Sequence, residues 1–189
     1  MKSPSSRPFT LLDGMILVAA TAAGFATIRA HSRFLLLDLP HPQGSWRLLD
    51  IMGWVLRWIT PFLEAWSFAF LVIAYREPHP RWRVWLRRPG NVACIAATMA
   101  LACEYTWIAL ICVRFWEPHR RLWGQGYVPS LHPMSFVSGV GSWIVGAWLA
   151  LFLSGSWRPA RGWVERLGRA IGIVWILAWI VPSVLRAFL

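Results

Sequence analysis

The sequence has few charged residues, a single lysine and few acids. Charged residues make up 14% of the 189 residues, and 57% belong to the set A, V, I, L, M, F, W, Y and C. Soluble domains usually carry about 25% charged residues, so this composition excludes an ordinary soluble domain, a disordered chain and a coiled coil. The 19 Lys and Arg, of which only Lys2 is lysine, oppose 8 acids for a net charge of +11. The composition indicates an integral membrane protein.

The motifs of common enzymes and metal proteins are absent. The chain has no C-x-x-C, nucleophile elbow, P-loop, G-x-G-x-x-G or H-E-x-x-H, and no paired aspartates of an intramembrane protease. Its three cysteines, Cys94, Cys103 and Cys112, are nine residues apart, so successive ones point to opposite sides of one helix and cannot pair within it. We therefore expect no enzyme activity, no cofactor and no metal.

Five stretches are long and apolar enough to be membrane helices, each close to the roughly 20 residues that cross a bilayer. The second of them contains Pro61, where we expect a bend between an interfacial part and the span. The sequence predicts an all-α, polytopic transmembrane helix bundle, with residues 1–189 as one integral membrane domain. The predicted spans are 9–28, 49–75, 92–113, 135–153 and 169–188.

The connectors between these spans are rich in Pro, Gly, Arg and Trp. Tryptophan sits among lipid headgroups and arginine reaches their phosphates, so these segments predict contacts with a bilayer containing anionic headgroups. Their arginines adjoin the spans and leave no free basic domain, so we expect no nucleic acid partner.

The distribution of cations predicts the orientation. With the N-terminus inside, the inner segments hold 11 Lys and Arg and the outer segments hold 7, with Arg57 left within the second span. Positive residues accumulate on the cytoplasmic side, so we expect a cytoplasmic N-terminus. A retained first helix is favoured over a cleaved signal peptide because its apolar run is long for one.

Ionisable residues inside the spans are the candidate functional residues, because charge at membrane depth is costly and faces the bundle interior. Asp50, Arg57 and Glu64 are seven residues apart on one helix face, and Glu104 lies near the middle of the next span. Glu64 and Glu104 could meet at one depth and share a proton or a cation, gated by Arg57. The competing hypothesis is that these residues only fix helix register.

Asp13 is expected to be an interfacial residue near the inner end of its span. On the third helix, Glu104 shares a side with Ala93, Ala97 and Ala100, and this side should face protein.

Small residues at intervals of four predict close helix packing. The first span has such a pair, Ala20 with Gly24, and the fourth span has a longer row. The spacing does not decide whether the helix that packs against this longer row belongs to this chain or to another subunit. That row is Ser138, Ser142, Gly146 and Ala150.

Histidines gather in the outer connectors of this topology, but no H-x3-H or i, i+4 pair exists, and we predict no metal site there. These residues are His31, His41, His119 and His132, accompanied by Asp38 and Glu117.

Two segments, RPFTLLDGMILVAATAAG and PFLEAWSFAFLVIAYREPHPRWRVWLRRPGNVACIAA, resemble parts of uncharacterised bacterial multi-pass membrane proteins. The resemblance covers about a third of the chain and implies a bacterial integral membrane protein, hence the inner membrane. It implies no function and no site residue.

Two functions remain. The first is a non-catalytic structural or accessory subunit of a membrane assembly, in which the chain meets other membrane subunits or copies of itself. The alternative is a small proton or cation transporter or channel component that uses Glu64, Glu104 and Arg57.

Overall fold

The computed structural model describes the backbone of residues 9–35, 47–76, 82–123, 133–157 and 162–188. It describes the side chains of 9–29, 51–76, 84–107, 109–110, 139–157, 162–185 and 187–188. Within these ranges the chain is helical and has no strand. The helices are α1 (Leu11–Leu35), α2 (Arg47–Tyr75), the single turn α3 (Trp82–Trp85), α4 (Pro89–Trp123), α5 (Pro133–Leu153) and α6 (Trp163–Phe188).

Among the described residues, three helices and not five are long and apolar enough to cross a membrane. They are Leu11–Arg29, Ile51–Tyr75 and Trp163–Leu185. The described apolar run of α5, Gly139–Leu153, is shorter. α4 is not among the three, and its side chains are described without a gap only over residues 89–107. The all-α prediction is therefore confirmed, and the membrane-span prediction is confirmed for three helices.

Helix ends differ from the predicted span ends because polar residues extend a helix beyond its apolar stretch. α6 begins at Trp163, six residues before the predicted span, and this places Glu165 on the helix. α2 continues through Pro61, where a bend was predicted. The short α3 was not predicted, since one turn has no periodicity to read.

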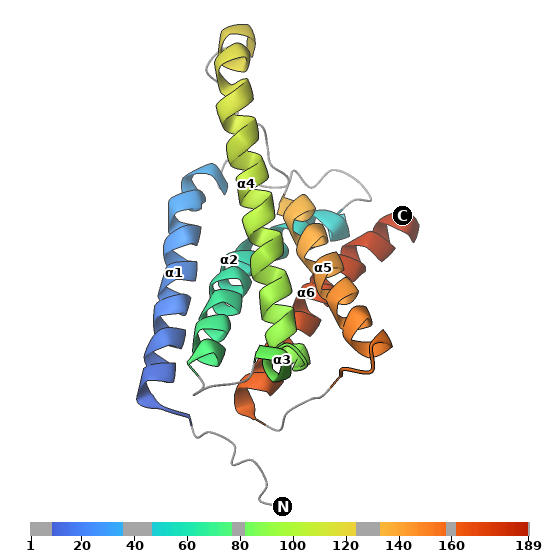
Figure 1. Cartoon of the computed structure of the whole chain (residues 1–189). Coiled ribbons are helices and arrows are strands. Elements are labelled where there is room, and N and C mark those ends of the chain that lie inside the picture. The colour runs from blue at the N-terminus through green and yellow to red at the C-terminus, as the bar shows by residue number, and fades with distance from the viewer. Residues whose placement is uncertain (1–8, 36–46, 77–81, 124–132, 158–161, 189) are drawn as a thin grey trace, which may run out of the picture.

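The five long helices form one bundle (Figure 1). α1 packs against α2, and α4, α5 and α6 pack against one another, while α2 contacts all three of them. Small side chains on α4 allow this close packing: Ala93, Ala97 and Ala100 are buried, which confirms that this row faces protein. Phe70 of α2 and Trp175 of α6 fill the space beside them.

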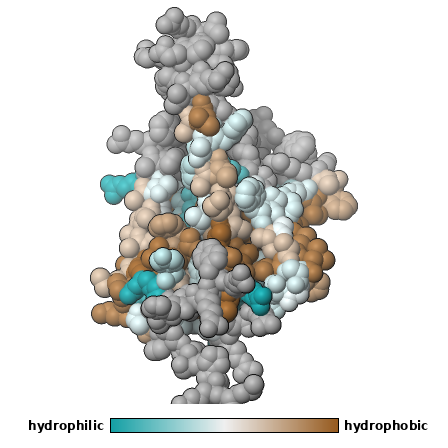
Figure 2. Space-filling view, viewed as in Figure 1, coloured by the Kyte–Doolittle hydropathy of each residue, from teal (hydrophilic) through white to brown (hydrophobic). Residues whose placement is uncertain are grey.

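The outer surface is apolar and several polar groups lie inside. Figure 2 shows apolar side chains over much of the described surface, and large residues such as Leu11, Phe25 and Phe68 are exposed. By contrast, Asp13 and Ser67 are fully buried. Large exposed apolar areas on a water-soluble monomer are rare, whereas a bilayer would cover this surface.

Candidate functional site

Glu64, near the middle of α2, accepts a hydrogen bond from a neighbouring helix. The Tyr105 hydroxyl of α4 donates to Glu64 Oε2 over 2.8 Å. Glu64 is half-buried and Tyr105 is 51% exposed, so this contact lies at the edge of the bundle. Tyr105 was not singled out from the sequence, although its position next to Glu104 is the signal that could have found it.

Glu104 belongs to the same polar cluster. Its charge and that of Glu64 are close enough to interact, so the structure brings together the two carboxylates that the sequence paired. The carboxylate of Glu104 also lies against Gly139 of α5, where an added Cβ would overlap Oε1. We call Glu64, Tyr105 and Glu104 the central cluster.

The other two candidates on α2 are placed differently. Arg57 is half-buried two turns before Glu64 on α2. Asp50 is in the first turn of α2, and its side chain lies outside the described residues.

The small-residue rows have two environments. On α1, Ala20 is buried, and a Cβ added to Gly24 would lie 2.6 Å from the Phe62 ring of α2, so this row packs inside the chain. On α5, Ser142, Gly146 and Ala150 are exposed, and a Cβ on Gly146 would meet nothing within 4 Å. Ser138 lies on α5, but its side chain is outside the described residues.

Asp13, in the first turn of α1, is fully buried within the protein. The Thr10 amide donates to Asp13 Oδ2 over 3.0 Å, and the Asp13 amide donates to Thr10 Oγ1 over 3.3 Å. This reciprocal pair caps the first turn of α1. Arg76, after the end of α2, lies 3.7 Å from Asp13 Oδ1. The Asp13 carboxylate can be buried because the Thr10 amide donates a hydrogen bond to it and Arg76 places a positive charge beside it.

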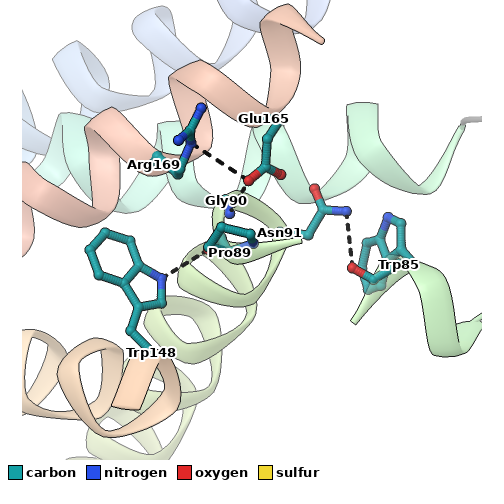
Figure 3. Close-up of polar contacts among 7 residues, drawn as sticks. All are labelled: Trp85, Pro89, Gly90, Asn91, Trp148, Glu165 and Arg169. Atoms are coloured by element: carbon teal, nitrogen blue, oxygen red, sulfur yellow. Dashed lines mark hydrogen bonds and ion pairs between the residues drawn. The ribbon is translucent and has the colours of Figure 1, made fainter. Parts of the chain in front are cut away.

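Glu165 caps a helix other than its own, which sequence reasoning missed. Its Oε1 accepts a hydrogen bond from the Gly90 amide at the start of α4 over 2.8 Å, and Arg169 Nε lies 3.7 Å from the same oxygen (Figure 3). The first amides of a helix lack intrahelical partners and carry partial positive charge, so a buried carboxylate is stabilised there. The i, i+4 spacing of Glu165 and Arg169 was the available signal.

Glycines allow α4 and α6 to meet closely at this point. A Cβ on Gly168 would lie 2.8 Å from the Gly90 carbonyl oxygen, and a Cβ on Gly90 would lie 2.5 Å from the Glu165 carbonyl oxygen. Trp148 of α5 completes the contact by donating from Nε1 to the Pro89 carbonyl over 2.9 Å (Figure 3). We call Pro89, Gly90, Trp148, Glu165 and Gly168 the α4 anchor.

One further buried polar pair joins two helices. Trp175 Nε1 of α6 donates to Ser67 Oγ of α2 over 3.1 Å, and that hydroxyl donates to the Leu63 carbonyl. Both side chains are fully buried. The predicted outer histidines and acids lie outside the described side chains, and they are His31, Asp38, His41, Glu117, His119 and His132.

The described residues define an all-α helix bundle with three helices able to cross a membrane. Comparisons with protein-family models, with curated proteins and with solved structures find no match to this chain. The segments that resemble uncharacterised bacterial membrane proteins therefore add no family and no function.

Proposed function

We propose that this protein is a non-catalytic integral membrane subunit that helps to hold a membrane assembly together. We place it in the bacterial inner membrane with a cytoplasmic N-terminus and with all five long helices spanning. The distribution of Arg and Lys supports this orientation. In such a subunit the function lies in its surfaces and its rigidity.

This proposal rests on one observation about the four carboxylates whose side chains are described. Each of them contacts another helix of the bundle or a residue just after the end of another helix. Asp13 of α1 meets Arg76, and Glu165 of α6 meets Gly90 of α4. Glu64 of α2 meets Tyr105 of α4, and Glu104 of α4 lies against α5. Acids placed at membrane depth are costly, and here each contributes to the arrangement of the helices.

The exposed face of α5 gives the proposal a surface for assembly. The small residues Ser142, Gly146 and Ala150 of α5 are exposed, and small residues on an outer face let another helix approach. α1 offers a second outer face, since it packs mainly against α2.

The experiment that tests this function is native mass spectrometry of the full chain extracted from its own membrane in mild detergent. We expect a second membrane protein, or further copies of this chain, at fixed stoichiometry. Recovery of the chain alone across several mild detergents, together with ion flux by the purified protein in liposomes, would overturn the proposal.

The second candidate function is proton or cation transfer through the central cluster. It is favoured by the proximity of Glu64 and Glu104 and by the hydroxyl of Tyr105 beside them. This candidate function predicts proton or cation flux by the purified protein in liposomes. It also predicts that Glu64→Gln and Glu104→Gln each abolish that flux. The matched control is Glu165→Gln, which changes a carboxylate outside the cluster and should leave such flux in place.

A further inference from the structure

An open groove of about 540 Å³ lies between α4 and α5 on the outer surface of the bundle. Leu86, Val92, Ile95 and Met99 line it from one side, and Gly146 and Ala147 from the other. Its lining is almost wholly apolar. Neither Glu64 nor Glu104 lines it, so the groove is separate from the central cluster.

The groove starts at the level of the α4 anchor. Leu86 lies three residues before the start of α4, and Met99 is seven residues beyond Val92, which gives a length of about 10 Å along the helix. At the same end, Trp148 binds the Pro89 carbonyl and packs edge-on against Trp157, with ring centroids 5.8 Å apart. Tryptophans gather at the membrane–water interface, so this end of the groove lies at headgroup level and the rest lies deeper.

A positively charged residue, Arg87, lies at this end of the groove. Arg87 follows Leu86 and is exposed, and none of the carboxylates with described side chains forms an ion pair with it. A guanidinium binds phosphate oxygens through paired hydrogen bonds. The groove therefore joins an apolar channel to an available positive charge, a combination that matches an amphiphile with a negative headgroup.

We infer that this groove binds one anionic phospholipid, with an acyl chain against Val92, Met99 and Gly146 and the phosphate at Arg87. The charge at the mouth favours a lipid over a second apolar helix, which would leave Arg87 without a negative partner. The inference rests on the membrane insertion in the proposed function, and a partner helix of the proposed assembly would then meet α5 outside the groove, at Ala150, or meet α1.

The test is native mass spectrometry of the full chain released from nanodiscs made of equal parts phosphatidylcholine and phosphatidylglycerol. The wild type should retain phosphatidylglycerol in preference to phosphatidylcholine. Arg87→Gln should weaken this retention about fivefold, because one arginine at an anionic surface contributes about 1 kcal/mol. The control is Arg29→Gln, which removes a charge from α1, a helix that does not line the groove. It should leave retention unchanged.

A second variant tests the apolar part. Gly146→Leu fills the groove where the structure has nothing within 4 Å of the added Cβ, so the fold should persist while lipid retention falls. Ala150→Leu adds similar bulk to an exposed position on the same helix outside the groove, and it should retain lipid as the wild type does.

The proposal is overturned if Gly146→Leu and Ala150→Leu retain the lipid equally, or if Arg87→Gln has no effect. Loss of self-association in Gly146→Leu with lipid retention intact would assign the groove to a second copy of this chain and also overturn it. Should Gly146→Leu misfold, Arg87→Gln still decides, because Arg87 lies outside the helices. Lipid retention is measured on the chain alone, so failure to find a protein partner would affect only the proposed function.

Discussion

The α4 anchor and the central cluster use the same residue type in two ways. In the anchor, Glu165 is 3% exposed and its Oε1 accepts the Gly90 amide. In the central cluster, Glu64 accepts a phenol hydroxyl, and the donor, Tyr105, is 51% exposed. One carboxylate is enclosed, and the other stays at the edge of the bundle.

The difference follows from where along a helix each acid lies. At a helix start the first backbone amides have no intrahelical acceptor, so they can bind a carboxylate and offset the cost of burying it. Midway along a helix every amide is already bonded to a carbonyl one turn back. A carboxylate there needs a side-chain donor, such as Tyr105, or partial exposure. The anchor should therefore dominate stability, and the cluster should contribute little.

The largest effect is expected for Gly168→Ala. The new methyl would lie 2.8 Å from the Gly90 carbonyl oxygen and close to other backbone atoms of α4, so α4 and α6 have to separate. Overpacking of this kind costs about 1–3 kcal/mol, and we expect the upper end because no side chain can move aside. Reversible unfolding in a detergent–SDS titration, followed by helical circular dichroism, measures it.

The control for this substitution lies on α5, beside the central cluster. Gly139→Ala also creates an overlap, but with the carboxylate of Glu104, the flexible end of a side chain. It should change the midpoint of unfolding far less than Gly168→Ala. Equal losses from the two alanines would show that the contrast between the two regions is wrong.

Glu165→Gln should have the next largest effect. The amide side chain keeps the size but loses the negative charge that faces the Gly90 amide and Arg169, and a hydrogen bond to a charged group contributes about 1.5–3 kcal/mol. We expect the unfolding free energy to fall by about 2 kcal/mol. Hydrogen exchange should also increase at the first amides of α4, and unchanged exchange there would argue against the cap.

Ser67→Ala is expected to be milder. It leaves the buried Trp175 indole N–H without its acceptor, and such contacts between membrane helices contribute at most about 1.7 kcal/mol. A loss of about 1 kcal/mol in the same titration is expected. Trp175→Phe should cost more, since it also removes packing volume, and the double variant should show that the two effects are not additive.

Tyr105→Phe should have the smallest effect. It removes only the hydrogen bond to Glu64 at a half-exposed site, and the average for such bonds in membranes is about 0.6 kcal/mol. If this variant destabilised the protein more than Glu165→Gln does, the central cluster and not the anchor would hold the bundle together.

The sequence predicted the helices better than the contacts between them. Apolar stretches of span length located all five long helices, because length and hydropathy are local properties. The ends were less accurate, as for α6, where Glu165 and Arg166 interrupt the apolar pattern although the helix continues through them. The two parts predicted on either side of Pro61 belong to one helix, α2.

The candidate site was predicted in part. Glu64 and Glu104 were paired from their depth in antiparallel helices, and their charges interact in the structure, while the shared proton or cation stays a prediction. Glu165 was missed because its partner is a backbone amide 75 residues earlier, and a backbone amide leaves no trace in residue type. The burial of Asp13 was not predicted, because its partner, Arg76, follows the end of another helix.

The length of α4 has a consequence for what the protein presents to water. Its 35 residues extend about 52 Å, whereas the hydrocarbon layer is about 30 Å thick. Figure 1 shows one end of α4 rising beyond the other helices, and the anchor holds the opposite end at Pro89 within the bundle. With α4 spanning the bilayer as proposed, the excess length falls on one side, as a helical extension of roughly 20 Å beyond the hydrocarbon layer. In that topology, proteins that never enter the bilayer could contact this extension of α4.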